Sequence, residues 1–326
     1  KWEVVANDPL NRRIDGRTSI PFAGGVSVAG KKHAVGTLAN CAGGVTPWNT
    51  ILTCEENYYK FYGDSFLEKG ERKKSSGKKH FYWDRFFKYP PEHYGWVVEV
   101  DPMTGKAQKH TSLGRFAHEC ATVARARDGR IVVYSGDDDE NQCIYKFISD
   151  DSKSLTKGTL YVAQMSTGKW LPLNLKTQPQ LKKYFTNDLD LLTHVRFAAH
   201  EIGATPLDRP EDIEIDPQSG HVYATLTNNA NKGNFHGSIL KIIEQNNDHG
   251  ALHFSSDTFL PGGSDTGFSC PDNLVFDPKG NLWMTTDISG EAIGKPPYES
   301  FKSNGLFYIP LHGPQAGHAI LLASAP

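Results

Sequence analysis

Short apolar or alternating runs recur along the whole chain, each bounded by Gly, Asn or an Asp-Pro pair. This pattern is typical of strands separated by turns. Long helical periodicity is nearly absent. One short helix is predicted over residues 181–200, where Leu189, Leu192 and Phe197 recur at roughly helical spacing. The pattern therefore predicts an all-β chain, and its clearest strands lie at 95–100, 130–134, 158–162, 221–226 and 281–286.

An internal repeat in the sequence indicates how these strands are grouped in the fold. Residues 209–225 resemble residues 270–285: each segment places an acid after a proline, then a strand, an Asp-Pro turn, a glycine and a second strand. The segment from His118 to Tyr134 repeats this plan without the proline. The acids at the start of each repeat are 92 and 61 residues apart, which is longer than a propeller blade of about 40–50 residues. The repeat predicts a β-propeller with insertions, in which these acids face the central channel.

Two insertions interrupt the repeat. Residues 58–94 hold twelve aromatic residues around a basic run, Lys73, Lys74, Lys78 and Lys79. Aromatic and basic residues together are compatible with nucleic-acid binding, but a surface loop packed on its own aromatics is the favoured interpretation. Residues 170–205 contain the predicted helix and are expected to cap one face of the propeller.

Composition and charge narrow the class of protein. The chain has 326 residues, with 35 Lys and Arg against 37 Asp and Glu, and a net charge of −2. That balance argues against a dedicated nucleic-acid binder, and no stretch approaches the roughly 20 apolar residues of a membrane span. Five cysteines in no zinc-like spacing argue against a disulfide scaffold. The length fits two domains or one large all-β domain, and the repeat favours a single propeller over residues 1–326.

The acids form the first candidate site. Glu55 and Glu56 are adjacent at the end of a predicted strand, and Glu119, Glu211 and Asp272 begin three repeats. Five carboxylates at one channel mouth would repel one another, and multivalent cations relieve that conflict. Oxygen ligands favour calcium or magnesium. Acids that merely cap turns are the alternative, which does not explain acids at equivalent positions of the repeat.

Two further residues are candidates for the same site. Cys41 lies in the glycine-containing segment 40–48, and its thiolate would suit a transition metal. A lone cysteine is more often a small buried apolar residue. Arg209 precedes Glu211 by two positions and could either grip a phosphate with two hydrogen bonds or pair with a neighbouring acid. The residues alone leave both alternatives open.

Several segments together resemble the PhoX-type alkaline phosphatase family. The matching segments are residues 40–57, 114–119, 133–138 with 145–147, 209–212, and 271–273 with 281–283 and Asp287. They occur in the family's order and span about residues 1–310. The resemblance implies a β-propeller, six-bladed in the family, whose channel holds Fe(III) and calcium joined through a bridging oxygen.

The resemblance also implies roles for single residues. Cys41 and three acids resemble iron or shared ligands, the acids being Glu119, Glu211 and Asp272. Glu55 and Glu56 resemble calcium ligands. Arg209 resembles a phosphate contact that acts in catalysis with Cys41, Glu119 and Glu211, and Trp48 and Asn273 are the further expected substrate-binding residues. Asn49 departs from the family, which has a glycine there.

The expected activity is hydrolysis of phosphate monoesters, with a metal-bound oxygen as nucleophile and Arg209 on the phosphate. No Ser, His or Asp nucleophile is needed, and His118 is expected to have a packing role. The resemblance implies a periplasmic or extracellular monomer that acts on small phosphate esters. Family members carry further strands at both ends, so the chain is expected to be a central part of a longer protein or a short relative. A calcium-dependent lactonase-type propeller and a non-catalytic propeller that binds protein partners are the alternatives.

Overall fold

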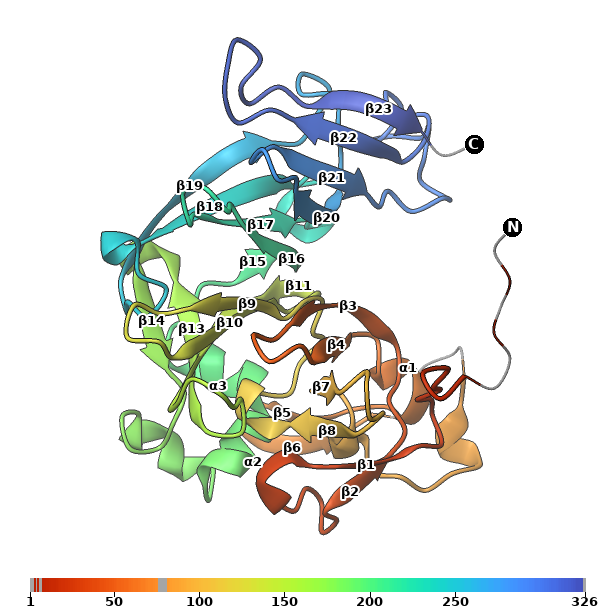
Figure 1. Cartoon of the computed structure of the whole chain (residues 1–326), viewed down its shortest axis with the longest axis vertical. Helices are drawn as coiled ribbons and strands as arrows, with labels where there is room; N and C mark the ends of the chain where they lie inside the picture. Colours follow the sequence, from red (N-terminus) through yellow and green to blue (C-terminus); the bar gives the residue numbers. More distant parts are fainter. Residues whose placement is uncertain (1–2, 4, 6–7, 76–80, 325–326) are drawn as a thin grey trace.

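Four antiparallel blades follow one another around a common axis (Figure 1). The structure, a computed structural model, describes residues 3, 5, 8–75 and 81–324. The first blade comprises β3 (Asn40–Val45), β4 (Ile51–Glu55), β7 (Val97–Val100) and β8 (Ala107–His110). The second comprises β9 (Thr122–Arg125), β10 (Ile131–Gly136), β12 (Ile144–Ser149), β13 (Gly158–Gln164) and β14 (Lys169–Pro172). The third comprises β16 (Pro210–Ile215), β17 (Val222–Leu226), β18 (Ser238–Glu244) and β19 (Phe254–Pro261), and the fourth β20 (Pro271–Phe276), β21 (Leu282–Thr286), β22 (Gly305–Ile309) and β23 (Ile320–Ser324).

Smaller elements connect and cover the blades. In the described part of the chain, three two-stranded sheets pair β1 (Ser19–Pro21) with β2 (His33–Val35), β5 (Ser65–Glu68) with β6 (Glu71–Lys74), and β11 (Glu140–Gln142) with β15 (Leu207–Asp208). The α-helices are α1 (Tyr59–Tyr62), α2 (Asp188–Thr193) and α3 (Val195–Glu201). Single 3-10 turns are η1 (Ala23–Gly25), η2 (Trp83–Arg85), η3 (Pro91–His93), η4 (Thr111–Leu113), η5 (Met165–Thr167), η6 (Pro179–Lys183), η7 (Ala230–Lys232) and η8 (Gln245–Asn247).

The apolar core lies between successive blades. Val132 of the second blade packs in one buried cluster with Ile213 of the third, and Ile239 of the third packs with Leu274 of the fourth. The innermost strands contact one another in the order β3, β9, β16 and β20. Burying apolar side chains between blades fixes each blade against the next and so brings the starts of the inner strands together.

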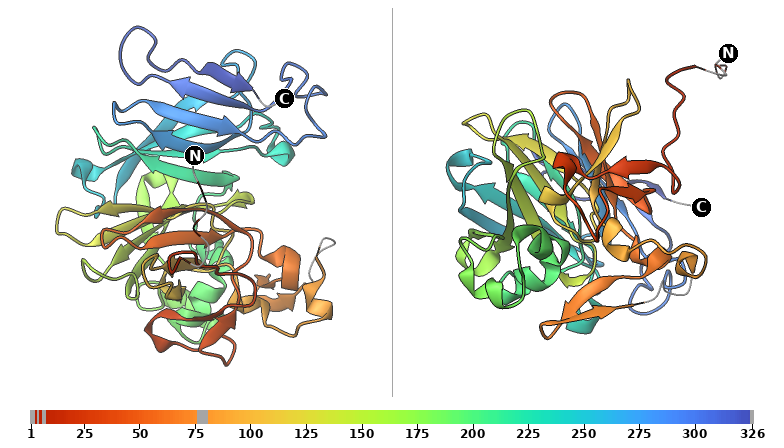
Figure 2. Two further views of the ribbon diagram at one scale, coloured as in Figure 1. Left: turned by 45° about the vertical axis from the view of Figure 1, so that its right-hand side comes forward. Right: turned by 90° about the horizontal axis from the view of Figure 1, so that it is seen from below.

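The predicted all-β propeller is confirmed. The described residues form four blades, whereas the family resemblance implied six. The single helix expected over 181–200 is instead η6 followed by α2 and α3, because the chain leaves helical geometry at His194, whose ψ is 39°. These helices pack against the strands of the second blade (Figure 2) through Leu181, Leu191 and Val195.

The insertion at 58–94 packs on its own aromatic residues, as predicted. Tyr62 stacks on Tyr94 with ring centroids 4.9 Å apart, and Trp83 meets Phe61 edge-on at 5.0 Å. Lys78 and Lys79 of its basic run lie outside the described residues. The hairpin of β5 and β6 in this insertion was not predicted.

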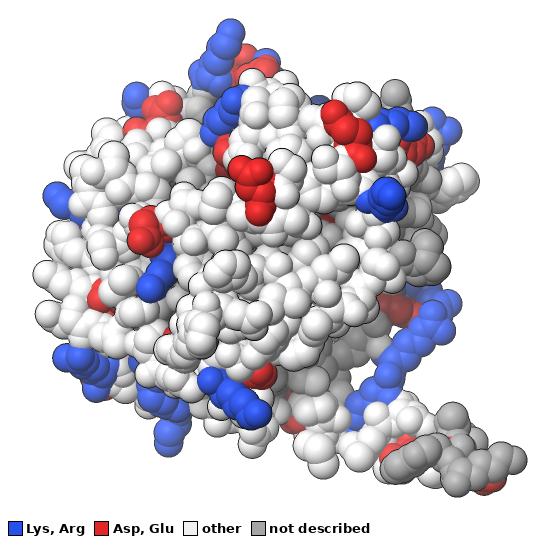
Figure 3. Space-filling model, turned by 90° about the horizontal axis from the view of Figure 1, so that it is seen from above, with Lys and Arg blue, Asp and Glu red and all other residues white. Residues whose placement is uncertain are grey.

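The fourth blade presents an outward face on which charged side chains lie mainly at the rim (Figure 3). Exposed apolar residues of this blade are Val275, Leu321 and Leu322. Within the described residues, no helix is long and apolar enough to cross a membrane.

Candidate metal centre and active site

The site is built where the inner strands begin. Cys41, Glu211 and Asp272 are each the second residue of an inner strand, in β3, β16 and β20. Directly before each of these strands, a residue other than glycine adopts a left-handed conformation, with φ of 51° at Ala39, 54° at Arg209 and 53° at Cys270. This conformation is costly for such residues. The same left-handed turn therefore recurs in three blades. In each blade it directs the side chain two positions later toward the axis.

Hydrogen bonds between blades hold the acids in register. Thr225 of the third blade donates to the backbone oxygen of Asp272 at 2.7 Å, and Thr227 donates to that of Pro271 at 3.0 Å. In the opposite direction, the backbone N–H of Leu274 donates to the buried Asp212 carboxylate at 2.9 Å. The start of β20 is thereby fixed relative to β16, and Asp272 is positioned beside Glu211.

The ligand-bearing atoms converge in two overlapping groups. Cys41, Glu56 and Glu119 each offer an atom within 4.8 Å of the other two, and so do Glu119, Glu211 and Asp272. The Cys41 thiol donates to Glu119 Oε1 at 2.9 Å. Glu119 is common to both groups, so its carboxylate lies between a group that includes sulfur and a group of oxygen donors only.

The groups line one cavity of about 460 Å³ whose walls are strongly acidic. Seven carboxylates line it, against the cations Lys60 and Arg209, so the formal charge of these side chains is −5. The lining residues are Cys41, Glu56, Asn57, Tyr59, Lys60, Glu119, Asp138, Asp139, Arg209, Glu211, Asp272, Asn273 and Asp287.

Burial and mutual repulsion perturb the acids. Burial, with the Glu56 and Asp138 charges adding to it, raises the pKa of Glu119 to about 8. The pKa of Glu56 rises to about 7 through burial and the nearby Asp138. Burial also raises the pKa of Glu211, of Asp272 and of the Cys41 thiol. All five pKa values are shifted upward, with burial as the largest cause in each case and the neighbouring carboxylate charges adding to it.

Arg209 is held at the edge of this cluster. Its Nε and Nη2 donate to the two oxygens of Asp138 at 2.9 and 3.1 Å. Burial opposes the charge of Arg209, but the Asp138 and Glu211 carboxylates raise its pKa above the usual range. Nη2 also lies 2.7 Å from Glu211 Oε1, although this buried oxygen has no partner in hydrogen-bond geometry. The sequence allowed two roles for Arg209, a salt bridge to a neighbouring acid or a contact with phosphate. The structure shows the salt bridge, and it lies within the cavity.

Glu55 is not part of this cluster, contrary to the prediction. Its carboxylate is fully buried, 2.7 Å from Lys109 Nζ. It also accepts backbone N–H bonds from Leu38 at 3.0 Å, Gly95 at 3.0 Å and Trp96 at 3.1 Å. Adjacent strand residues point to opposite faces, so only Glu56 of the pair reaches the cavity. Glu55 is a structural ion-pair partner.

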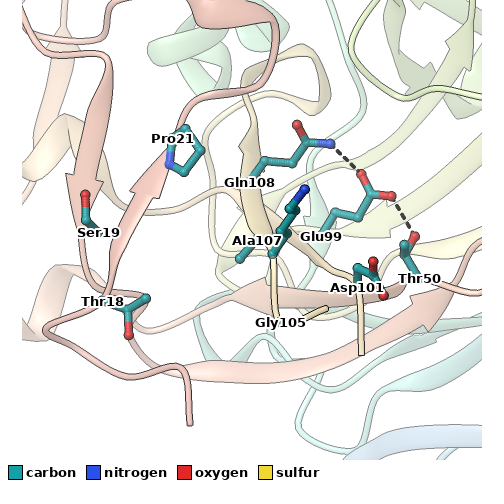
Figure 4. Close-up of a pocket in the computed structure, with 10 residues that line it drawn as sticks. Thr18, Ser19, Pro21, Thr50, Glu99, Asp101, Gly105, Ala107 and Gln108 are labelled. Carbon is teal, nitrogen blue, oxygen red and sulfur yellow. Dashed lines mark hydrogen bonds between the residues drawn. The ribbon is translucent and has the colours of Figure 1, made fainter. Parts of the chain in front are cut away.

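Trp48, expected to bind substrate, is also absent from the acidic cavity. Its Nε1 donates to Glu99 at 2.6 Å beside a different cavity of about 570 Å³, which lies between β1 and β8. Figure 4 shows Thr50 and Gln108 reaching the same carboxylate, and His110 donates to it at 2.7 Å. Glu99 is saturated by these donors, so Trp48 has a structural role.

His118 has the predicted packing role, since it is buried, stacks on Phe116 at 3.6 Å and bonds to Ser135. Asn273, expected to bind substrate, lines the cavity, and its contact with substrate stays a prediction. Reasoning from the sequence gave no role to the remaining lining residues, which are Asn57, Tyr59, Lys60, Asp138, Asp139 and Asp287. The run of three aspartates at 137–139 was the available signal.

The donor set fits bound metal ions. A thiol, an excess of carboxylates over cations and a buried carboxylate oxygen without a hydrogen bond are all found in one cavity. Thiolates suit transition metals, and oxygen-only groups suit calcium or magnesium. Metal ions would supply the missing positive charge.

Comparison with known proteins identifies the family. The family model described as alkaline phosphatase PhoX matches residues 1–323. The chain belongs to the PhoX alkaline phosphatase family. A solved structure of Pseudomonas fluorescens PhoX, in complex with the transition-state analogue vanadate, is similar with a TM-score of 0.82 and 31% sequence identity. That match covers 98% of this chain and 68% of that one.

Two further solved structures are much less similar. A putative gluconolactonase has 8% identity and a TM-score of 0.33, over 70% of this chain and 59% of its own. The Pseudomonas aeruginosa periplasmic gluconolactonase PpgL has 12% identity and a TM-score of 0.32, over 93% and 90%. No curated protein sequence matches the chain. As a member of the PhoX family, the protein is a metal-dependent phosphatase.

Proposed function

We propose that the acidic cavity holds Fe(III) and calcium and hydrolyses phosphate monoesters. The observation that supports this most directly is the position of Glu119 in both ligand groups. The group with Cys41 and Glu56 has the sulfur donor that suits iron, so we assign Glu56 to iron, whereas the family resemblance implied a calcium ligand. The group with Glu211 and Asp272 has only oxygen donors, which suit calcium, whereas the resemblance implied that these two acids are iron or shared ligands.

When bound, the metals would polarise the phosphoryl oxygens and supply an activated oxygen nucleophile. The chain's own residues bind and orient the ester. Arg209 uses Nε and Nη2 on Asp138, so its guanidinium is held rigidly while Nη1 takes no part in that ion pair. We infer that Arg209 binds the phosphate and stabilises the charge that develops on its oxygens. Asn273 lines the same cavity, and we infer that its side-chain amide donates a hydrogen bond to the phosphate.

Asp138 has a positioning role in this proposal. It accepts two hydrogen bonds from Arg209 and lies on the segment after β10. The neighbouring Asp137 is buried and ion-paired with Arg196 of α3. This second ion pair anchors the loop, so Asp138 can restrict Arg209 to one orientation toward the phosphate.

The position of Cys41 and Arg209 in one cavity favours a phosphatase over a calcium-dependent lactonase, because neither residue is needed for an oxygen-only calcium site. A non-catalytic partner-binding propeller would not need Arg209 either. Location outside the cytoplasm and a monomeric state are implied by the family resemblance and stay predictions.

The test is activity against p-nitrophenyl phosphate together with elemental analysis of the purified protein. We expect both iron and calcium in the active protein, loss of activity on chelation, and recovery only when both metals are restored. Full activity without either metal would contradict the proposal. Calcium without iron, with lactone hydrolysis and no phosphatase activity, would favour the lactonase alternative.

A further inference from the structure

A second cavity adjoins the acidic one and differs from it in character. It measures about 530 Å³ and is lined by Ala39, Asn57, Lys60, Phe61 and Phe81. Asn57 and Lys60 line both cavities. The two cavities therefore lie next to each other, and we name the second one the aromatic cavity. Its volume is in the range of small-molecule sites, about 300–1,000 Å³.

Two phenylalanine rings form the apolar wall of the aromatic cavity. Phe61 of α1 and Phe81 are stacked, with ring centroids 4.5 Å apart and an interplanar angle of 19°. Trp83 meets Phe61 edge-on at 5.0 Å and Tyr62 at 6.0 Å, so the Phe61 ring is held within the aromatic cluster of the insertion. Phe81 is nevertheless 49% exposed. A fixed, half-exposed aromatic pair beside a catalytic cavity is suited to stacking on a planar ring.

The boundary between the two cavities is polar and fixed. Asn57 donates through its side-chain nitrogen to Glu56 and accepts from the Tyr59 hydroxyl at 3.1 Å. Lys60 follows on α1 and places a cation at the same boundary. From the acidic cavity outward, the order is therefore the phosphate-binding cluster, then a polar and cationic boundary, then aromatic rings.

We propose that the aromatic cavity is a leaving-group subsite that accepts a planar ring carried by the phosphate ester. The inference rests on the proposed phosphatase function, because the phosphate must occupy the acidic cavity for the ring to reach Phe61 and Phe81. Nucleobases and aryl groups share the planar π face that this wall recognises. The protein then prefers phosphate monoesters whose leaving group bears a ring over those with the same ester bond and no ring.

The preference is measured with substrate pairs that break the same kind of bond. Adenosine 5′-monophosphate and ribose 5-phosphate both release a primary alcohol, and only the first carries a base. Stacking of a base on an aromatic side chain is worth about 1–3 kcal/mol, so we expect kcat/KM to be about 5–150-fold higher for adenosine 5′-monophosphate. A second pair, 2-phenylethyl phosphate and ethyl phosphate, tests an aryl ring. A preference in both pairs supports recognition of any planar ring, whereas one in the first pair alone restricts the subsite to nucleobases.

Substitutions in the aromatic wall test whether Phe61 and Phe81 cause the preference for substrates that carry a ring. Phe81→Leu and Phe61→Leu should lower kcat/KM for adenosine 5′-monophosphate, mainly through KM, and leave ribose 5-phosphate unchanged. Phe86→Leu is the matched control, because Phe86 is 77% exposed on the same insertion and does not line the aromatic cavity. Equal kcat/KM for the two sugar phosphates, or an equal loss on both in Phe81→Leu, would overturn the subsite while the phosphatase function stands. Failure to hydrolyse either substrate would contradict the proposed function itself.

Discussion

Exchanging Glu55 for Gln tests whether the adjacent residues Glu55 and Glu56 have different roles, the first structural and the second in the acidic cavity. Glu55 Oε1 accepts from Lys109 Nζ and from the backbone of Leu38, and Oε2 accepts from the backbone of Gly95 and Trp96. A glutamine side chain must turn its NH₂ group toward one of these sets of donors. Either orientation places donor against donor and leaves the Lys109 charge buried without its counterion.

The cost follows from the burial of both partners. The side chains of Glu55 and Lys109 are each 0% exposed. Removing one partner of a buried pair costs about 3–5 kcal/mol, because the remaining charge is uncompensated. An unfolding entropy of about 2.1 cal/mol/K per residue, applied to 326 residues, converts this cost to a fall in Tm of about 4–7 °C.

The assay is urea and thermal unfolding of metal-free protein, with Glu56→Gln as the control. Glu56 lies in the acidic cavity, so its exchange should leave the metal-free stability unchanged or slightly raised while it weakens metal binding. Glu55→Gln should show the opposite pattern. The double variant Glu55→Gln/Lys109→Met should recover part of the loss, because the unpaired charge is gone. A Glu55→Gln protein of wild-type stability that has lost calcium would refute this reasoning.

The remaining predictions concern the cavity and the first blade. Arg209→Lys keeps the charge but loses the two-pronged contact with Asp138, so kcat/KM for p-nitrophenyl phosphate should fall about tenfold to a hundredfold with metal content unchanged; unchanged kinetics would exclude Arg209 from phosphate binding. Cys41→Ser should remove iron and most activity while circular dichroism stays native, and retained iron would contradict the ligand assignment. Although burial opposes ionisation, hydrogen bonds from His110, Thr50 and Trp48 lower the pKa of Glu99 to about 2. This contribution of about 3 kcal/mol should be present above about pH 4.5 and be lost as the pH falls toward 2. Chemical unfolding at each pH should show that the free energy of unfolding falls less steeply with falling pH in Glu99→Gln than in the wild type. The same pH dependence in both proteins would contradict the lowered pKa.

Local patterns in the sequence predicted the strands of the propeller and three acids of the candidate metal centre. The repeated acid, strand and turn placed Glu119, Glu211 and Asp272 at equivalent positions, and the structure brings them together. That inference works because each blade repeats the same backbone path, visible as left-handed residues directly before β16 and β20. Equivalent positions in the repeat become neighbours at the axis.

Contacts distant in sequence were not predictable in the same way. The pattern around Glu55 and Glu56 could not say which of the two faces the axis, because the answer depends on Lys109, 54 residues away. Trp48 is likewise held in its structural position by a hydrogen bond to Glu99, which lies 51 residues away in the sequence. Packing between strands decides which buried residues become partners. The local pattern of polar and apolar residues carries no information about that packing.

The most direct test of the metal centre is a crystal structure with anomalous diffraction recorded on both sides of the iron absorption edge. The account predicts an iron peak within bonding distance of Cys41 Sγ and the Glu119 carboxylate, with further density for calcium beside Glu211 and Asp272. An active enzyme whose crystals show no metal density among these four side chains would contradict it.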